Sequence, residues 1–255
     1  MTTGLVLSGG GFRGIAHIGV IKAMEEAGIN ATHVAGTSSG AIIGSLYAAG
    51  YSYQEILEFV KGVNLFSIYK YAVNKPGFVD TEKFQKDFKR LFPEDSFSAL
   101  KLPMSITATD VLKGSLKVFS TGPIIRPLLA SAAFPGVFTP VKIGSDYFID
   151  GGTLNNFPVD LLRAECKNII GVYVNPFLKI QIEDLKYSYQ VLERAYQIRA
   201  ASTSTDKFKD CDLLITPEGM HKFGTFSQKA AEIVFDLGYQ SAKQKMGKFL
   251  ERITK

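Results

Sequence analysis

The residues of this chain most able to do chemistry lie in the pentapeptide Gly36-Thr37-Ser38-Ser39-Gly40. It follows a short apolar run, residues 32–35, and precedes an apolar, alanine-rich stretch, residues 41–49. This order predicts a strand, a sharp turn and a helix, with the Ser38 hydroxyl exposed at the turn. Glycines two residues to either side suit such a turn because the backbone folds back tightly there. Ser38 is therefore a candidate nucleophile, although a plain Gly/Ser turn fits the same five residues.

A glycine-rich loop, Gly9-Gly10-Gly11-Phe12-Arg13-Gly14, comes directly after a strand predicted at 5–8 and before a helix predicted from Ile15 to about Gly28. Three successive glycines expose backbone amides that can bind a phosphate or the oxyanion of an acyl intermediate. A Walker loop would end in Gly-Lys-Ser/Thr, which is absent. A dinucleotide site would need an acidic residue at the end of the second strand, where the serine pentapeptide stands instead. The loop thus favours an oxyanion-binding role.

An aspartate followed by two glycines, Asp150-Gly151-Gly152, ends the second of two short strands predicted at 141–143 and 147–149. Open α/β sheets place their chemistry at the carboxyl ends of strands. Asp150 is therefore a candidate acid or base. An ordinary Asp-Gly turn is the alternative and, for these three residues alone, the commoner object.

In combination these blocks resemble the patatin-like phospholipase family, and they follow one another in that family's order. The similarity covers most of the first two-thirds of the chain, whereas the rest carries no motif of the family. Gly152 stands where many members have alanine, a variation that occurs within the family. The matching blocks are the glycine-rich segment Gly9–Val20, the nucleophile segment Gly36–Ala41, Ala108–Asp110, Ser131–Phe138 and the aspartate segment Asp150–Val159.

The resemblance implies an α/β fold with three α/β/α layers and a mainly parallel sheet, of the acyltransferase, acyl hydrolase and lysophospholipase type. It implies a lipid acyl hydrolase in which Ser38 is the nucleophile and Asp150 its general base, with an acyl-enzyme intermediate and no metal or cofactor. The oxyanion hole would comprise Gly9, Gly10, Gly11 and Arg13, and the supporting motif residues would be Gly14, Gly36, Ser39, Gly40, Gly151 and Gly152.

A Ser–Asp dyad competes with a triad that includes a histidine, and the chain has three histidines. His17 lies in the predicted first helix and His33 at the start of the second strand, and we interpret both as packing residues. His221, in a polar connection late in the chain, suits the Ser…Asp…His order of the α/β-hydrolases and is the rival. Aspartate is a weaker base than imidazole, so the dyad predicts that an apolar wall raises the pKa of Asp150.

Length and composition predict one large α/β domain, because 46% hydrophobic residues suffice for one large core. The resemblance implies that this is a single patatin-like domain over residues 1–255, with its motif blocks within 5–160 and its last helix at about 227–253. No apolar run reaches membrane-spanning length and the first strand begins at once, so we expect a cytoplasmic protein without a signal peptide. Cys166 and Cys211 show no metal or redox spacing and are interpreted as buried thiols. We expect no nucleic-acid partner and predict no oligomeric state.

The other elements are predicted from local patterns. A capping box at Ser52–Glu55 predicts a helix start, and an amphipathic pattern with Phe84 and Phe88 predicts a helix after Asp80. Further strands are predicted at 104–109, 116–120, 169–174 and 213–216. A helix over about 227–253 closes the chain, and its predicted apolar side comprises Ile233, Val234, Leu237, Met246, Phe249, Leu250 and Ile253.

The substrate is the least defined feature of the sequence. A formal charge of +5, a pI near 9.0, 19 Phe and 11 Tyr suit a lipid or phospholipid ester and peripheral contact with an anionic membrane surface. A basic surface over an aromatic core explains the same composition more simply. Residues 62–79 are a candidate lid, or equally a segment packed on the core, and residues 219–226 are a second candidate rim. Arg13 is assigned equally to a substrate phosphate and to a structural ion pair.

Two other functions stay open. An acyltransferase could use the same serine, but acyltransferases with a related sheet use a histidine partner, and the Asp150 block argues against this. A non-catalytic regulatory module is the third possibility, which the intact serine, glycine loop and aspartate disfavour.

Overall fold

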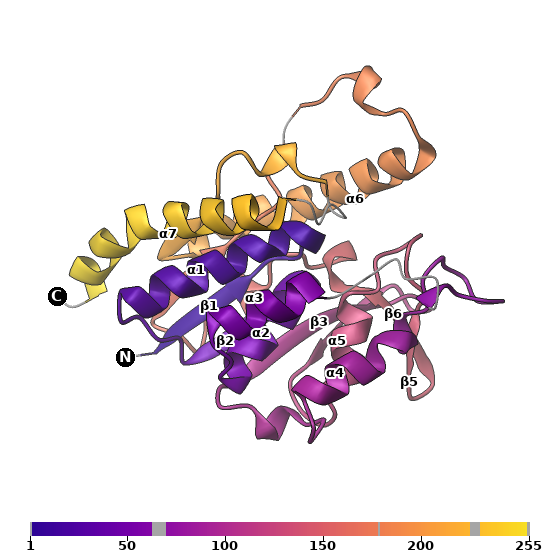
Figure 1. Cartoon of the computed structure of the whole chain (residues 1–255), viewed down its shortest axis with the longest axis horizontal. Coiled ribbons are helices and arrows are strands. Elements are labelled where there is room, and N and C mark those ends of the chain that lie inside the picture. Colours follow the sequence, from indigo (N-terminus) through magenta and orange to yellow (C-terminus); the bar gives the residue numbers. More distant parts are fainter. Residues whose placement is uncertain (1, 63–69, 178, 225–229, 254–255) are drawn as a thin grey trace.

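A mixed β-sheet forms the centre of the computed structural model, which describes residues 2–62, 70–177, 179–224 and 230–253 (Figure 1). Its pairing order is β5-β6-β3-β2-β1-β7-β8, with β4 paired to β3. The strands β3, β2, β1, β7 and β8 are parallel, whereas β4, β5 and β6 add antiparallel pairs at one end. The strands are β1 Thr3–Leu7, β2 His33–Thr37, β3 Met104–Asp110, β4 Ser115–Phe119, β5 Val141–Ile143, β6 Asp146–Asp150, β7 Asn168–Val172 and β8 Leu213–Ile215.

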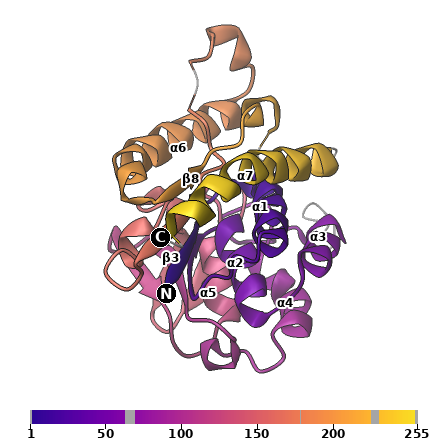
Figure 2. The ribbon, with the colours of Figure 1, turned by 90° about the vertical axis from the view of Figure 1, so that its left-hand side faces the viewer.

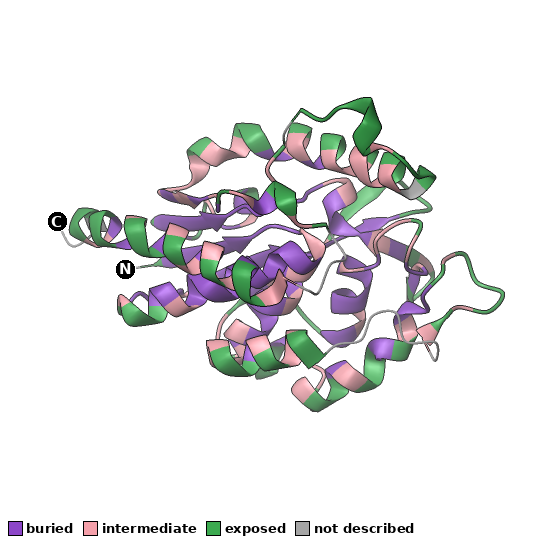
Figure 3. Ribbon diagram, turned by 45° about the horizontal axis from the view of Figure 1, so that its top comes forward, coloured by how far each residue is buried: buried purple, intermediate pink, exposed green. Residues whose placement is uncertain are grey.

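Helices cover one face of the sheet. α2 and α5 pack on β2 and β3, and α7 lies along α1. One cluster of buried side chains joins these helices to the strands, and Figure 3 shows the buried residues concentrated on the sheet and on the inner sides of the helices. The helices are α1 Ile15–Glu26, α2 Ser39–Ala49, α3 Tyr53–Gly62, α4 Gln85–Leu91, α5 Ile125–Ser131, α6 Ser188–Ser204 and α7 Ala231–Ile253.

The opposite face is covered mainly by irregular chain that follows β6. Phe157, Val159 and Leu162 pack there on Val6 and Ala35. α6 lies on this side of the sheet, away from α1 and α2 (Figure 2). It contacts two short 3-10 helices, Gly151–Thr153 and Thr205–Asp210. The predicted α/β/α layering is therefore present, around a sheet that is parallel at its centre.

The last helix, α7, differs from its prediction on one face. Ile233 is 58% exposed, whereas Val234, Met246 and Phe249 are buried. The reason is a close backbone contact with α1: a Cβ atom at Gly238 would collide with the carbonyl group of Ala16. This contact fixes which side of α7 faces α1, and Ile233, five residues before Gly238, is turned away from it. Predicted positions 227–229 and the side chain of Ile253 lie outside the described residues.

Several local predictions are confirmed. Ser52 and Glu55 form the predicted capping box, with the Ser52 N–H donating to Glu55 Oε2 at 2.8 Å. α1 ends before Gly28, which adopts φ of +68°, a left-handed conformation that favours glycine. Cys166 is buried, but Cys211 is only partly buried, so the prediction of two buried thiols is wrong for Cys211. Over the residues that the structure describes, none of the helices combines the length and the apolar character needed to cross a bilayer.

Candidate active site

Ser38 lies at the turn between β2 and α2, with φ of 54° and ψ of −124°, a backbone conformation that non-glycine residues rarely adopt. The turn is tight. A Cβ atom at Gly36 would lie 2.5 Å from the carbonyl oxygen of Gly40, and one at Gly40 would collide with the carbonyl of Leu7. The Ser38 N–H donates to Ser131 Oγ at 2.8 Å, which ties the turn to the end of α5. Backbone packing thus explains the glycine spacing around the serine.

Strand register brings Asp150 next to this turn. β4 occupies one edge of β3, so β2 and β6 pair in succession along its other edge. Thr37 at the end of β2 is opposite Thr107, and Asp150 at the end of β6 is opposite the next residue, Ala108. Because β2 runs parallel to β3 and β6 runs antiparallel, the carboxyl ends of the two strands meet. Ser38 and Asp150 therefore converge from opposite directions.

The Asp150 carboxyl group is buried, with 1% of the residue exposed. Its Oδ1 accepts the Gly152 N–H at 2.8 Å and the Tyr196 hydroxyl at 2.9 Å. The Ser38 hydroxyl also approaches closely enough to act on this carboxyl as a hydrogen-bond donor. Burial raises the pKa of Asp150 to about 6, although these three hydrogen bonds each act to lower it. The raised pKa agrees with the expectation for an aspartate that serves as a base.

The amides of the glycine loop differ in their hydrogen-bond partners. The Gly9 N–H donates to the Asn156 carbonyl at 3.2 Å, and the Gly9 carbonyl accepts from Asn175 Nδ2. Gly9 is therefore held by the protein, which differs from its predicted place in the oxyanion hole. Among the described residues, no acceptor is recorded for the N–H groups of Gly10 and Gly11, and both residues line the same cavity as Ser38.

Arg13 follows the three glycines of the loop and is only 6% exposed. Its guanidinium donates to the Phe223 carbonyl at 2.9 Å, to Asn175 Oδ1 at 3.0 Å and to Glu193 Oε1 at 3.4 Å. These acceptors come from three separate parts of the chain. Of the two interpretations of Arg13, this geometry supports the structural ion pair over a contact with a substrate phosphate. These contacts also differ from the place in the oxyanion hole that the resemblance implies for Arg13.

Ser38, Asp150, Gly10 and Gly11 open onto one cavity of about 160 Å³. Its lining is mainly apolar and extends between α2, α4 and α5. The apolar side chains include Ile42, Phe59, Phe84, Phe88, Leu129 and Phe138. A reacting group beside Ser38 would thus be continuous with space suited to a hydrocarbon chain.

A family model described as "Patatin-like phospholipase" matches residues 5–163, more than half of the chain. The chain belongs to the patatin-like phospholipase family. It is 28% identical over 289 residues to human "Patatin-like phospholipase domain-containing protein 6", and this match covers 96% of the chain and 20% of the human protein. It is 30% identical over 173 residues to "Lysophospholipase NTE1" of Yarrowia lipolytica, covering 66% of the chain and 12% of that protein. The chain thus spans a fifth or less of the length of these relatives.

Among solved structures, VipD from Legionella pneumophila matches this patatin-like chain with a TM-score of 0.64 and 17% identity. The match covers 97% of the chain and 67% of VipD. At this identity the likeness shows the shared fold, and the predicted fold family is confirmed.

The histidines of the patatin-like chain lie away from the cavity lining that the structure describes. His17 is fully buried in α1, and its Nε2 contacts the Ser8 carbonyl at 2.8 Å. Burial lowers the pKa of His17 to about 4. His33 lies against Thr32 at the start of β2. His221 is exposed in a 3-10 helix at Met220–Lys222, and the observed geometry gives it no part in the cavity.

Sequence reasoning missed three residues of this site. Ser131 lies inside a segment quoted for the family resemblance, but nothing in that pattern marked its hydroxyl as a partner of Ser38. Tyr196 and Glu193 lie on α6, outside the region matched by the family model. Their spacing of three residues puts both on one side of a helix, but no motif accompanies them. Across the described chain, no group of three or more His, Cys, Asp or Glu side chains could hold a metal ion.

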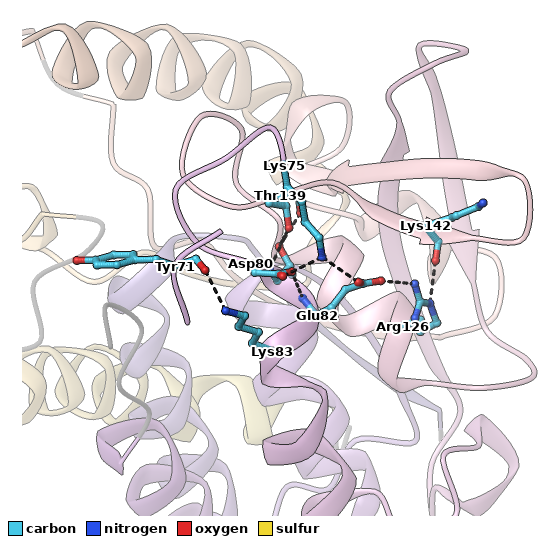
Figure 4. Close-up of polar contacts among 9 residues, drawn as sticks. Tyr71, Lys75, Asp80, Glu82, Lys83, Arg126, Thr139 and Lys142 are labelled. Carbon is cyan, nitrogen blue, oxygen red and sulfur yellow. Dashed lines mark hydrogen bonds and ion pairs between the residues drawn. The ribbon is translucent and has the colours of Figure 1, made fainter. Parts of the chain in front are cut away.

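The candidate lid at 62–79 is described only in part, since residues 63–69 lie outside the described residues. The part from Lys70 onward is held by polar contacts (Figure 4). Lys75 Nζ binds Asp80 Oδ2 at 2.8 Å and Glu82 Oε2 at 3.3 Å, and Arg126 binds Glu82 at 2.8 Å. The Lys83 ammonium donates to the Tyr71 carbonyl at 3.0 Å, and the Tyr71 ring points away from this cluster.

The second candidate rim, residues 219–226, is described as far as Gly224, and residues 225–226 lie outside the described residues. Gly219 begins the 3-10 helix that carries His221. Phe223 accepts the Arg13 hydrogen bond through its carbonyl group. The described part of this segment therefore helps to hold Arg13, and with it the end of the glycine loop, in place.

Proposed function

We propose that this chain is a lipid acyl hydrolase that cleaves carboxylic ester bonds of phospholipids or lysophospholipids through Ser38 and Asp150. The observation that carries the proposal is the approach of the Ser38 hydroxyl to a buried carboxyl group of raised pKa, at one end of an apolar cavity. Relatives named as a phospholipase-domain protein and a lysophospholipase support a lipid ester as the substrate.

In the first half of the reaction, Asp150 accepts the Ser38 proton while Oγ attacks the ester carbonyl carbon. We assign Asp150 Oδ2 to this transfer, because Oδ1 already accepts two hydrogen bonds. The amides of Gly10 and Gly11 donate hydrogen bonds to the carbonyl oxygen as negative charge develops on it. Loss of one such donor typically raises the barrier by about 3 kcal/mol. The tetrahedral intermediate then collapses, the carbon–oxygen bond to the alcohol breaks, and Asp150 returns the proton to the leaving alkoxide.

In the second half, water takes the place of the alcohol. Asp150 accepts a proton from the water as its oxygen attacks the acyl carbon on Ser38. The second tetrahedral intermediate binds the same two amides, and its collapse releases the fatty acid while Ser38 regains its proton from Asp150. Each step conserves protons, and no metal or cofactor takes part.

The test combines covalent labelling with hydrolysis. A fluorophosphonate probe should label Ser38, and the protein should release fatty acid from lysophosphatidylcholine, whereas Ser38→Ala should do neither. Asp150→Asn should lose hydrolysis and His221→Ala should retain it; the reverse result would replace the dyad with a histidine mechanism. Products formed with and without an acceptor thiol distinguish hydrolysis from acyl transfer, and a protein without labelling or turnover would be a regulatory module.

We also propose that the end of the molecule around the cavity rests on a lipid surface. Two segments project from the body of the molecule in Figures 1 and 3, the loop 70–79 and the stretch that precedes α6. They present apolar side chains to solvent: Val73 is 74%, Phe78 72% and Ile182 74% exposed. The ion pairs of Lys75 with Asp80 and Glu82 tie the first loop to the residues that follow it, which lowers the ordering cost when its apolar residues enter a bilayer.

Vesicle sedimentation tests this contact. Phe78→Asp and Ile182→Asp should each weaken binding to phosphatidylcholine vesicles, and the formal charge of +5 should make binding tighter when phosphatidylglycerol is added. Ile233→Asp is the matched control, because it changes an exposed isoleucine on α7. Equal loss of binding in all three variants would indicate a nonspecific effect.

A further inference from the structure

One contact of the general base is not used by the mechanism above. The Tyr196 hydroxyl donates to Asp150 Oδ1 at 2.9 Å, on the same oxygen that accepts the Gly152 N–H. Tyr196 comes from α6, 46 residues further along the chain. Burial and the neighbouring Asp150 charge raise the pKa of Tyr196 well above its ordinary value. Its hydroxyl therefore stays protonated, and can donate, over the whole range in which Asp150 titrates.

The Tyr196 hydroxyl occupies space that only a glycine at position 152 leaves free. A Cβ atom at Gly152 would collide with the Tyr196 hydroxyl and would lie 2.6 Å from Asn156 Oδ1. Real Cβ atoms do not approach other atoms this closely, so a side chain at this position would displace the tyrosine from Asp150. The glycine that ends the aspartate triplet is thus matched to a tyrosine from a segment without any motif.

Two further contacts hold Tyr196 in this place. Its ring packs on Phe134, with the ring centroids 4.6 Å apart. One turn earlier on α6, Glu193 pairs with Arg13 behind the glycine loop. A single face of α6 therefore reaches both the base and the loop that carries the amides of Gly10 and Gly11. Tyr196 has few alternatives to its bond with Asp150, since Phe134 holds its ring and the Glu193–Arg13 pair holds the helix one turn away.

We propose that Tyr196 is the positioning residue of the general base, and that Gly152 is required because it leaves room for the Tyr196 hydroxyl. This proposal rests on the proposed function of Ser38 and Asp150. The donor on Oδ1 keeps the carboxylate plane fixed, so that Oδ2 faces the serine. It also stabilises the charged form of Asp150, which burial disfavours. Among the described residues, the other ionisable groups that line this cavity are Arg13, Glu193 and Asp87, with Tyr173 close to Tyr196.

The first test is the pH dependence of kcat/KM for lysophosphatidylcholine or a short p-nitrophenyl ester. Tyr196→Phe removes the donor and should move the acid limb of the profile upward by about 1 pH unit. A shift of that size from a pKa of about 6 predicts roughly a fivefold loss at pH 6 and almost none at pH 8 from ionisation alone. A parallel loss at every pH would overturn the role in tuning the base.

Gly152→Ala should shift the acid limb as Tyr196→Phe does, because it displaces the same hydroxyl. The double variant should show the same limb as Tyr196→Phe alone, since the hydrogen bond can be lost only once. If the shift of the acid limb in the double variant equalled the sum of the two single shifts, Gly152 would act independently of Tyr196. Tyr239→Phe is the matched control, because the Tyr239 hydroxyl also donates to a carboxylate, Glu26 Oε2 at 2.7 Å, on the contact between α7 and α1.

An activity-independent readout separates this proposal from the proposed function. The stability difference between the wild type and Asp150→Asn, measured by urea unfolding from pH 4 to pH 8, reports the pKa of Asp150 in the folded protein. In a Tyr196→Phe background, the pH above which this stability difference stops changing should move upward by about 1 unit. An unmoved upper limit overturns the positioning role. If no ester is hydrolysed but the upper limit moves, the proposed function fails while the Tyr196 contact stands.

Discussion

The wall of the cavity is built from two regions that differ in kind. The region matched by the family model, residues 5–163, supplies Ser38, Asp150 and the glycine loop through short motifs. The later stretch, residues 175–200, supplies only side chains, with no motif around them. The first region is constrained because its backbone must pass through turns where any side chain would collide. The second needs only a suitable polar atom at the right place, which many local sequences can provide.

The largest expected effect separates the two regions. Ser38→Ala and Asp150→Asn should each lower kcat/KM by about 10⁴-fold or more, because each removes a group that touches the reacting atoms in the proposed mechanism. Tyr196→Phe should lose almost nothing at pH 8, since it acts through the ionisation of Asp150. Steady-state kinetics with lysophosphatidylcholine measure both. If Tyr196→Phe lowered kcat/KM at pH 8 as much as Ser38→Ala does, the distinction between residues that react and residues that position them would be wrong.

Within the first region, His17 should make folding sensitive to acid. Burial lowers its pKa from 6.5 to about 4, so between these values the unfolded chain binds a proton that the folded protein does not. Stability that is fully present above pH 6.5 should therefore be lost as the pH falls towards 4, by about 3 kcal/mol. Urea unfolding of His17→Gln at pH 7 and pH 4.5 measures this. If the variant lost as much unfolding free energy between pH 7 and pH 4.5 as the wild type, groups other than His17 would cause the acid sensitivity.

Asp150 should have the opposite effect on stability. Burial raises its pKa from 3.8 to about 6, so the folded protein binds a proton more tightly than the unfolded chain. The carboxylate then costs stability as the pH rises from 3.8 through 6, and the full cost is present at pH 8. Asp150→Asn should therefore be more stable than the wild type by up to about 3 kcal/mol at pH 8 and by almost nothing near pH 3.5. A variant that is less stable at pH 8 would contradict the burial argument.

The smallest expected effect tests the second region alone. Glu193→Gln removes the charge that faces Arg13 but keeps an acceptor, so the free energy of unfolding should fall by about 1–2 kcal/mol. Thermal unfolding measures this loss. Glu183→Gln, an exposed change in the stretch before α6, is the control and should stay within about 0.5 kcal/mol. Equal effects of the two changes would mean that the Arg13 pair does not anchor α6.

Sequence alone determined the elements and residues whose requirements are local. The turn at Ser38 could be predicted because backbone collisions at Gly36 and Gly40 leave no other choice, and the capping box at Ser52–Glu55 because its partners are three residues apart. The order of strands and helices followed from hydrophobic patterns of short period. The exposed side of α7 could not be predicted, since Ile233 is placed by a contact between Gly238 and α1.

Only the tertiary structure decided which distant groups meet. The register of β2 and β6 along one edge of β3 places Ser38 beside Asp150, and burial by the surrounding layers raises the pKa of that carboxyl. The tertiary structure also gave the Gly9 amide a protein acceptor and brought Tyr196 and Glu193 to the site. Such contacts depend on the packing of segments far apart along the chain, and therefore leave no fixed spacing for a sequence pattern to record.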